Sequence, residues 1–418
     1  MSVVHSALGY LILLGLTWLV GTRTRQIPWK TLGLAALLQL LLTGLLVKTG
    51  LRQHVFSLVG HLTDLLRATA LKANESLLFS GITSAKFTGD YGPIVALEIG
   101  AILIFIASLS RVLYHYRILP WFIALLSRFM QKMLGISAAE SVGVSANIFL
   151  GMTEAPLLIR PYVQRLTESE LFCLMVGGMA TIAGTVMVIY ATILGSVHPD
   201  IAGHLFTASL ISAPAAIAVA KLMIPETAET ETGNVQIDLP RDDTQNGLDA
   251  AARGAVEGMH LFINVLAMLI AFIGLVALTN QVIGWIDIWV NGGTATWSLQ
   301  AMAGYLFRPF VWLMGISWQE AQIVGQLMGM KTMLNEFVAY LDLAAHMNGP
   351  RLLSDRAFII STYAMCGFAN FGSVAIMIGG IGSIAPDRRG DLARLGLRSM
   401  LAGTIATMLT GCVVGIFL

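Results

Sequence analysis

The sequence predicts an all-α polytopic membrane protein with eight transmembrane helices, two re-entrant helical hairpins and further helices at the membrane interface. Of its 418 residues, 56% are hydrophobic and 12% are charged, and the mean hydropathy is +0.76. Soluble domains carry about 25% charged residues. The apolar residues form stretches of about 20 residues, the length that crosses a bilayer. Two further segments place polar residues in the middle of apolar sequence.

Charge and cysteine content exclude several classes of protein. The formal net charge is +1 and no basic patch is present, so nothing predicts binding to nucleic acid, which depends on contacts to phosphates. The three cysteines, Cys173, Cys366 and Cys412, lie in apolar stretches. That placement favours packing roles over a disulfide framework or a metal site.

Eight segments are apolar and long enough to be spans. The first is followed by Arg23 and Arg25 and has no basic region before it, so we expect a retained span and not a cleaved signal peptide. The eight spans are residues 5–22, 31–51, 94–114, 171–195, 203–224, 255–290, 357–384 and 393–418.

Basic residues predict the orientation, because Lys and Arg in short loops favour the cytoplasm. Clusters follow spans one, three and seven: Arg23, Arg25 and Lys30; Arg111, Arg117, Arg128 and Lys132; Arg388, Arg389, Arg394 and Arg398. They share one side if the N-terminus is outside, and eight spans then place the C-terminus outside too. The polar segment 225–254 falls in the cytoplasm, where its composition predicts a solvated linker.

Two segments, 137–167 and 319–350, carry glycines and charges midway and must begin and end on the same side. They are predicted to be re-entrant hairpins, since broken backbone at membrane depth must be buried in protein or face water. Amphipathic aromatic segments precede both hairpins, at 119–134 and 305–314, and suit interfacial helices.

The order span, interfacial helix, hairpin, span, span occurs twice. Residues 94–224 form the first copy and residues 255–418 the second, while 1–93 contribute spans one and two and an amphipathic connector. Short strings recur at matching places: Gly135-Ile136-Ser137 as Gly315-Ile316-Ser317, and Ala183-Gly184-Thr185-Val186 as Phe371-Gly372-Ser373-Val374. The predicted hairpins enter from opposite sides, so the repeat is inverted, which is a transporter architecture. Chance similarity of short Gly/Ser strings is the alternative.

Polar side chains mark the middle of each hairpin. Asn147, Thr153 and Glu154 lie in the first, before Pro156, and Asn335 and Glu336 lie in the second. Ionisable groups at membrane depth usually mark a substrate or ion path. A structural ion pair between Glu154 and Arg160 is the alternative for the first hairpin. For the second, a pair between Glu336 and Lys331 has a spacing that does not suit a helix.

Spans four and seven contribute further candidates. Uncharged oxygens of Asn147 and Thr181, with carbonyls freed at a half-helix end, could replace water around a cation. Ordinary interhelical hydrogen bonding explains the same two residues equally well. The glycines of residues 366–373 could likewise serve only close helix packing.

Three motifs resemble the concentrative nucleoside transporter family. They are Gly-Met-Thr-Glu-Ala-Pro-Leu-Leu-Ile-Arg-Pro-Tyr at 151–162, Asn-Glu-Phe-Val-Ala-Tyr at 335–340 and Cys-Gly-Phe-Ala-Asn-Phe-Gly-Ser at 366–373. The resemblance covers essentially the whole chain and is weaker over 1–90. It implies a homotrimer in which each protomer has a scaffold and a mobile transport domain that moves as an elevator.

The resemblance also assigns roles to residues. Those matching Thr153 and Glu154 address the nucleobase, and those matching Glu336, Asn370 and Ser373 bind the ribose. The remaining matches are Phe368 and Val186, which pack on the nucleoside, and a sodium site of Asn147 and Thr181 side chains with backbone oxygens of Leu150 and Ile182.

Met152 departs from the family pattern, in which glutamine is usual. A thioether barely donates or accepts a hydrogen bond, whereas glutamine does both. We therefore predict altered or relaxed selectivity for uridine-like substrates, because a site without a matching polar partner discriminates poorly.

Together with the residues, the resemblance implies a cation-coupled importer, with sodium as the expected ion, of nucleosides such as uridine or adenosine in a bacterial inner membrane, with no cofactor besides the ion. Proton coupling through Glu154 or Glu336, and transport of another polar solute, are alternatives. An intramembrane enzyme is disfavoured, because no His-Glu-x-x-His motif or nucleophile with a nearby base is found. A channel would not need two buried hairpins that each carry a glutamate.

Overall fold

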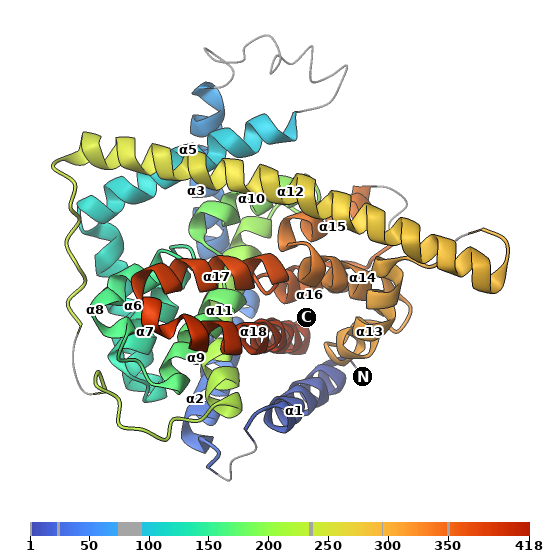
Figure 1. Ribbon diagram of the computed structural model, residues 1–418, viewed down its shortest axis with the longest axis horizontal. Coiled ribbons are helices and arrows are strands. Elements are labelled where there is room, and N and C mark those ends of the chain that lie inside the picture. The colour runs from blue at the N-terminus through green and yellow to red at the C-terminus, as the bar shows by residue number, and fades with distance from the viewer. Residues whose placement is uncertain (1, 23–25, 74–93, 234–236, 295, 349–351) are drawn as a thin grey trace.

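The computed structural model describes residues 2–22, 26–73, 94–233, 237–294, 296–348 and 352–418. Within these ranges the regular structure is entirely helical (Figure 1). The all-α membrane fold predicted from the sequence is confirmed. The N-terminal part comprises α1 (Ser2–Val20), α2 (Trp29–Thr43), a π-helical turn (Gly44–Lys48) and α3 (Leu51–Ala73). The predicted connector beyond residue 73 lies outside the described residues.

The rest of the chain contains the predicted order of elements twice. The first set is α5 (Val95–His115), α6 (Ile118–Leu134), α7 (Ala138–Asn147), the 3-10 helix η3 (Ala155–Ile159), α8 (Arg160–Val163), α9 (Glu168–Ala180), α10 (Gly184–Gly195) and α11 (Ile201–Met223). The second set is α12 (Gly247–Asn291), α13 (Leu299–Leu313), α14 (Glu320–Met333), α15 (Glu336–Asn348), α16 (Asp355–Met365), α17 (Phe371–Ile384), η4 (Pro386–Arg388) and α18 (Arg389–Phe417). Below, hairpin one means residues 137–167 and hairpin two means residues 319–348.

Two predicted spans are divided helices. Span four, predicted at 171–195, breaks between α9 and α10, where Thr181 adopts extended backbone (φ −114°, ψ 165°). Span seven, predicted at 357–384, breaks between α16 and α17, where Asn370 is extended and its side chain caps α17. Within the described residues, seven helical stretches are long and apolar enough to cross a membrane. Span seven is not among them, and its second half, α17, is an apolar helix of only 14 residues.

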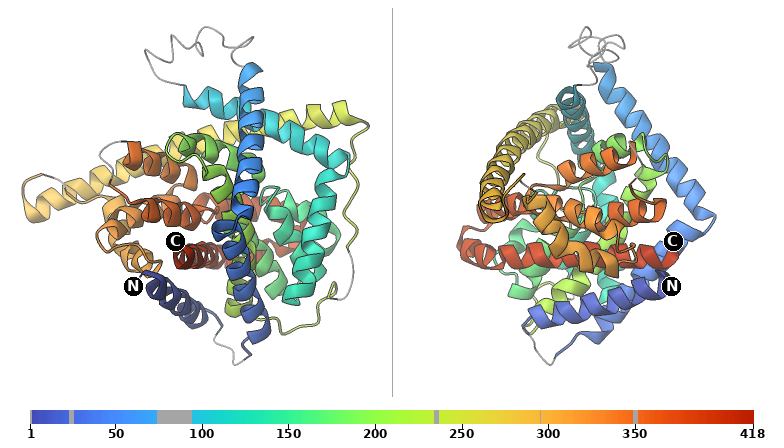
Figure 2. Two further views of the ribbon diagram at one scale, coloured as in Figure 1. Left: turned by 180° about the vertical axis from the view of Figure 1, so that it is seen from behind. Right: turned by 90° about the vertical axis from the view of Figure 1, so that its right-hand side faces the viewer.

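The last helix of each set lies at the centre of the molecule. Helix α11 packs against α18, and both are largely buried. Each also packs on the divided helix of the other set, α11 on α16 and α18 on α9. These contacts between helices of different sets join the two sets into one core, which Figure 2 shows from behind and from the side.

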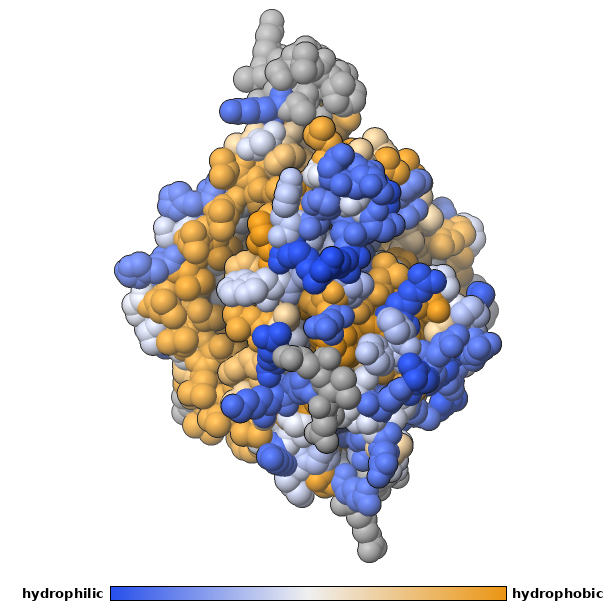
Figure 3. Space-filling model, turned by 90° about the vertical axis from the view of Figure 1, so that its left-hand side faces the viewer, coloured by the Kyte–Doolittle hydropathy of each residue, from blue (hydrophilic) through white to orange (hydrophobic). Residues whose placement is uncertain are grey.

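Helix α12 runs along the outside of this core against α5 (Figure 1). It is 45 residues long, starts earlier than the predicted span 255–290, and exposes most of its apolar side chains. The amphipathic helix α6 exposes Trp121, Phe122 and Leu125 in the same way. Figure 3 shows a broad apolar surface on one flank, with hydrophilic side chains gathered beside it. Exposed apolar area of this extent suits a bilayer.

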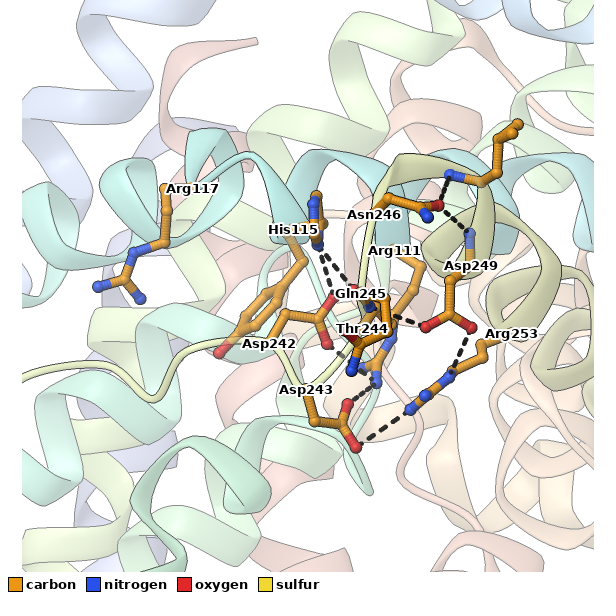
Figure 4. A network of polar contacts seen from close by, with 12 residues as sticks. Arg111, His115, Arg117, Asp242, Asp243, Thr244, Gln245, Asn246, Asp249 and Arg253 are labelled. Carbon is orange, nitrogen blue, oxygen red and sulfur yellow. Dashed lines mark hydrogen bonds and ion pairs between the residues drawn. The ribbon is translucent and has the colours of Figure 1, made fainter.

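The polar linker is packed more closely than its composition predicted. The main chain of Thr232 accepts a hydrogen bond from the Ala138 N–H at the start of hairpin one (3.0 Å). Further along, Arg111 of α5 pairs with Asp242 (3.3 Å), whose side chain is only 3% exposed (Figure 4). The final residues, 247–254, are already the first turns of α12. The predicted solvated connection is corrected here, because basic side chains of α5 bind the acidic ones of the linker.

Candidate functional site

Hairpin one is broken around its predicted polar residues. A capping box of Ser137 and Glu140 starts α7, which ends at Asn147. The chain is irregular over 148–154, and Pro156 then lies in the first turn of η3, where proline is well tolerated. The Gly184 N–H donates to the Phe149 carbonyl (3.1 Å). The break in hairpin one is thereby tied to the break between α9 and α10.

The predicted cation residues lie at this junction. Asn147 is only 2% exposed, yet neither polar atom of its amide has a hydrogen-bond partner among the described residues. The Thr181 hydroxyl donates to the Gly177 carbonyl of its own helix (2.9 Å). Leu150 and Ile182 are buried beside them, and the Ile182 carbonyl accepts one hydrogen bond from Ser209 (3.2 Å). Interhelical hydrogen bonding therefore does not account for Asn147, since a buried amide without partners is costly.

Helix ends reinforce this arrangement electrostatically. Helices α7 and α9 pack together, and both end at the junction without a basic residue in the last turn. The C-terminal end of a helix carries partial negative charge from its unpaired carbonyls. Side-chain and backbone oxygens that can act as ligands, beside two helix ends whose last turns hold no basic residue, fit a small cation such as sodium.

Hairpin two breaks at Leu334 and Asn335, and Glu336 is the first residue of α15. The Tyr190 hydroxyl of α10 donates to Glu336 Oε1 (2.6 Å), and Asn370 Nδ2 donates to Glu336 Oε2 (3.1 Å). Asn370 Oδ1 in turn accepts from the Ser373 N–H (2.7 Å). Three predicted residues, Glu336, Asn370 and Ser373, thus form one hydrogen-bonded chain. Its carboxylate lies at a helix N-terminus, which favours negative charge.

Tyr190 belongs to this chain and was not predicted. It lies within the apolar span 171–195 and outside every recognised motif, so its sequence context gave no sign of a site. The only signal is a phenol within an apolar span, because a buried Tyr hydroxyl usually needs a hydrogen-bond partner. Two aromatic rings, Phe337 and Tyr340, pack around it.

The middle of hairpin one contacts α17, the helix that contains Ser373, at a position further along that helix. A Cβ added at Gly380 would lie 2.7 Å from Thr153 Cγ2, so Thr153 lies directly against α17. Met152 is 9% exposed and packs beside Gly178 of α9. Glu154 is exposed and accepts from the Gly151 N–H (3.3 Å). Among the described residues no ion pair joins it to Arg160, so that alternative is not supported.

The predicted residues therefore form two groups that meet on α17. In the described part of the chain, no hydrogen bond joins Thr153 or Glu154 directly to Glu336 or Asn370. Val186 and Phe368, the two predicted packing residues, are half-buried near the start of α10 and at the break before α17. Gly367 brings the two divided helices together, because a Cβ there would lie 2.8 Å from the Met179 carbonyl oxygen.

Half-helices that end inside an apolar helical protein, with buried polar groups at the breaks, define a membrane transporter. Three family models match consecutive parts of the chain. They describe the Na+ dependent nucleoside transporter N-terminus over residues 8–73, nucleoside recognition over 96–197, and the Na+ dependent nucleoside transporter C-terminus over 204–415. The chain belongs to the concentrative nucleoside transporter family, whose members are transporters and not enzymes.

Individual relatives match over their full length. An uncharacterized transporter of Haemophilus influenzae is 39% identical, over 100% of this chain and 98% of the relative. The nucleoside permease NupC of Helicobacter pylori is 35% identical, over 100% of this chain and 98% of the relative. The solved structure of CNTnw in an inward-facing substrate-bound state has a TM-score of 0.92 and 37% identity, covering 100% of this chain and 98% of that one.

Proposed function

We propose that this protein is a sodium-coupled importer of nucleosides that works by alternating access. The observation that carries the proposal is the hydrogen-bonded chain from Tyr190 through Glu336 and Asn370 to Ser373 at the meeting point of two broken elements. A carboxylate and an amide held side by side can accept from and donate to two neighbouring hydroxyls, such as the 2′ and 3′ hydroxyls of a ribose. Relatives named for nucleoside transport support this substrate class.

Each group of residues takes one part of the nucleoside in this proposal. Glu336, Asn370 and Ser373 bind the ribose, and Thr153 and Glu154 bind the nucleobase from hairpin one. The half-buried Val186 and Phe368 pack on the nucleoside, and Met152 lies beside the base-binding residues. The contacts of both groups with α17 support this division, because one helix then fixes the spacing between ribose and base residues.

Sodium is proposed to bind at the junction of hairpin one with the divided helix α9–α10. The ligands are the side-chain oxygens of Asn147 and Thr181 and the backbone oxygens of Leu150 and Ile182. The unpaired amide of Asn147 supports this site, as does the Thr181 hydroxyl, which donates to its own helix and keeps its lone pairs free. An ion there would order hairpin one before the nucleoside arrives.

Three further parts of the proposal concern the whole assembly. The chain is a bacterial inner-membrane protein with both termini outside, it forms a homotrimer, and its transport domain moves as an elevator within a fixed scaffold. Residues 94–224 and 255–418 act as inverted repeats, and the exchange of contacts between α9, α11, α16 and α18 supports a shared transport core.

Uptake of radiolabelled uridine and adenosine into proteoliposomes tests the function. An inward sodium gradient should drive accumulation of at least one nucleoside, while a potassium gradient of equal size should not. Saturable uptake driven by a proton gradient alone would support the second candidate, a proton-coupled nucleoside symporter. Saturable uptake of another polar solute, without competition from nucleosides, would contradict the proposed substrate class.

A further inference from the structure

Hairpin two contains a buried lysine whose role is unexplained by substrate binding. Lys331 lies in the last turn of α14 and is completely buried. Its Nζ donates to the Ala364 carbonyl of α16 (3.0 Å) and to the Thr407 hydroxyl of α18 (3.1 Å). Within the described part of the chain no carboxylate forms an ion pair with it. Neutral oxygens and helix ends therefore surround this amino group, an environment that resembles the ligand shell of a metal cation.

The environment of Lys331 corresponds to that of the cation site in hairpin one. In each hairpin the first half-helix ends beside the end of the first half of a divided helix: α7 beside α9, and α14 beside α16. Each junction therefore gathers the partial negative charge of two helix C-termini. In the first junction neither helix has a basic residue in its last turn, and Asn147 keeps unpaired polar atoms.

The second junction already contains a positive group. Among the last turns of α14 and α16, Lys331 is the basic residue present. Its hydrogen bonds join α14, which leads into Glu336, to the last turn of α16, which leads into Asn370. The lysine therefore holds together the two segments that carry the Glu336–Asn370 hydrogen bond.

We infer that Lys331 is a built-in cation that performs in hairpin two the ordering role that a mobile coupling ion performs in hairpin one. It is a positioning residue, because it acts through Glu336 and Asn370. Since the second junction needs no ion from solution, the transporter couples one cation to each nucleoside. This inference rests on the proposed function and adds the stoichiometry and the reason for it.

The number of coupled ions can be measured on the wild-type protein. Proteoliposomes are given a tenfold inward sodium gradient with the membrane potential clamped at zero, and uridine is followed until net flux stops. One ion per nucleoside limits accumulation to about tenfold, whereas two ions would allow about a hundredfold. Accumulation well beyond tenfold would overturn the inference. Absence of any sodium-driven uptake would instead reject the proposed function, so the two failures are distinguishable.

Two variants separate charge from hydrogen bonding. Lys331→Gln keeps a donor but removes the charge, and Lys331→Met removes both. Both should weaken uridine binding about tenfold or more, the usual effect of losing one charged hydrogen bond, while sodium dependence keeps a Hill coefficient of one. Nearly normal uridine binding by Lys331→Gln would show a merely structural tether and overturn the inference. Thr332→Val is the matched control, because among the described residues the Thr332 hydroxyl bonds only the Met328 carbonyl of its own helix.

Discussion

At the scale of single residues, the phenol of Tyr190 is one of two groups that donate to the Glu336 carboxylate, the other being Asn370. The Tyr190 hydroxyl donates to Glu336 Oε1 at 2.6 Å from a fully buried ring. We expect Tyr190→Phe to weaken uridine binding roughly tenfold, since hydrogen bonds to charged groups contribute about 1.5–3 kcal/mol. Isothermal titration calorimetry at saturating sodium measures the change.

Tyr340→Phe is the control for that variant. Tyr340 is equally buried and packs against Tyr190, but its hydroxyl donates to the Thr362 carbonyl and not to the carboxylate (2.9 Å). Loss of the Tyr340 hydroxyl should lower the unfolding temperature of the protein, while its affinity for uridine changes little. Equal losses of binding in both variants would mean that general packing, and not the bond to Glu336, explains the effect.

At the residue scale we also predict that Met152 affects the selectivity among nucleobases. It is 9% exposed, precedes Thr153 in the chain and packs against Gly178, where an added Cβ would lie 3.0 Å from Met152 Cβ. Met152→Gln introduces an amide that both donates and accepts hydrogen bonds. It should increase the preference for one base over others by several-fold, because a competing base that cannot pair with the amide would leave a buried polar group without a partner. Competition of a nucleoside panel against labelled uridine measures this. Identical competition profiles for both proteins would contradict the role of Met152.

Polarity in an apolar context is what brought part of the candidate site to notice in the sequence. Asn147, Thr153, Glu154 and Glu336 stand out because polar groups at membrane depth are costly and need a reason. Tyr190 could not be found in this way, because tyrosine is common in apolar helices and its partner lies 146 residues away. Pairings between distant segments depend on tertiary packing, which local sequence does not encode.

At the scale of elements, the close approach of the two divided helices depends on Gly367. A Cβ there would lie 2.8 Å from the Met179 carbonyl oxygen and 2.9 Å from Thr407 Cγ2. Gly367→Ala should therefore destabilise the protein by about 1–3 kcal/mol, as overpacking does, and should also weaken nucleoside binding. Thermal unfolding in detergent and uridine titration measure both effects.

Gly379→Ala offers the comparison on α17, where an added Cβ meets no atom within 4 Å. Alanine favours a helix over glycine by about 0.5–1 kcal/mol, so this variant should be neutral or slightly stabilised. If both glycine variants behaved alike, the close packing at the helix breaks would not matter for stability.

The linker forms an element of its own through its contacts with α5. Asp242 is buried between Arg111 and His115, whereas the neighbouring Asp243 is 76% exposed and pairs with Arg253 at 3.1 Å. Asp242→Asn should lower the free energy of unfolding by roughly 2 kcal/mol, because the ion pair of a nearly inaccessible carboxylate with Arg111 is lost. Asp243→Asn should change it by less than about 1 kcal/mol, as exposed pairs do. Similar unfolding temperatures for both variants would contradict this account.

Element order was predictable, but element continuity was not. Hydropathy predicted the long apolar helices, and midway glycines and charges predicted broken helices in residues 137–167 and 319–350, while the re-entry of these two segments into the membrane stays a prediction. The breaks in spans four and seven were missed because Thr181 and Asn370 sit in sequence that stays apolar on both sides. The packing of the linker was missed because its composition is that of a solvated segment, and only the arginines of α5 give it a binding surface.

At the scale of the whole molecule, the two sets of helices depend on each other. Each divided helix packs on the final helix of the other set, and the hairpins approach the centre through the divided helices. Ordering one break therefore restricts the other, since Gly367 places the second break against the end of α9. A cation at the first break and a nucleoside across both should each favour the state that the other requires.

This dependence makes a quantitative prediction about coupling. Sodium should tighten uridine binding by some factor in the range of about 5–150, and uridine should tighten sodium binding by the same factor, because coupling free energies are reciprocal. Calorimetry of uridine in sodium and in choline, with sodium binding measured with and without uridine, gives both factors. Asn147→Ala should bring both coupling factors close to one, because it removes a proposed ion ligand and leaves the hydrogen-bonded chain of Tyr190, Glu336 and Asn370 unchanged. If the affinity for uridine did not depend on sodium but depended on pH, the coupling ion would be a proton. The proton carrier would then be Glu154 or Glu336.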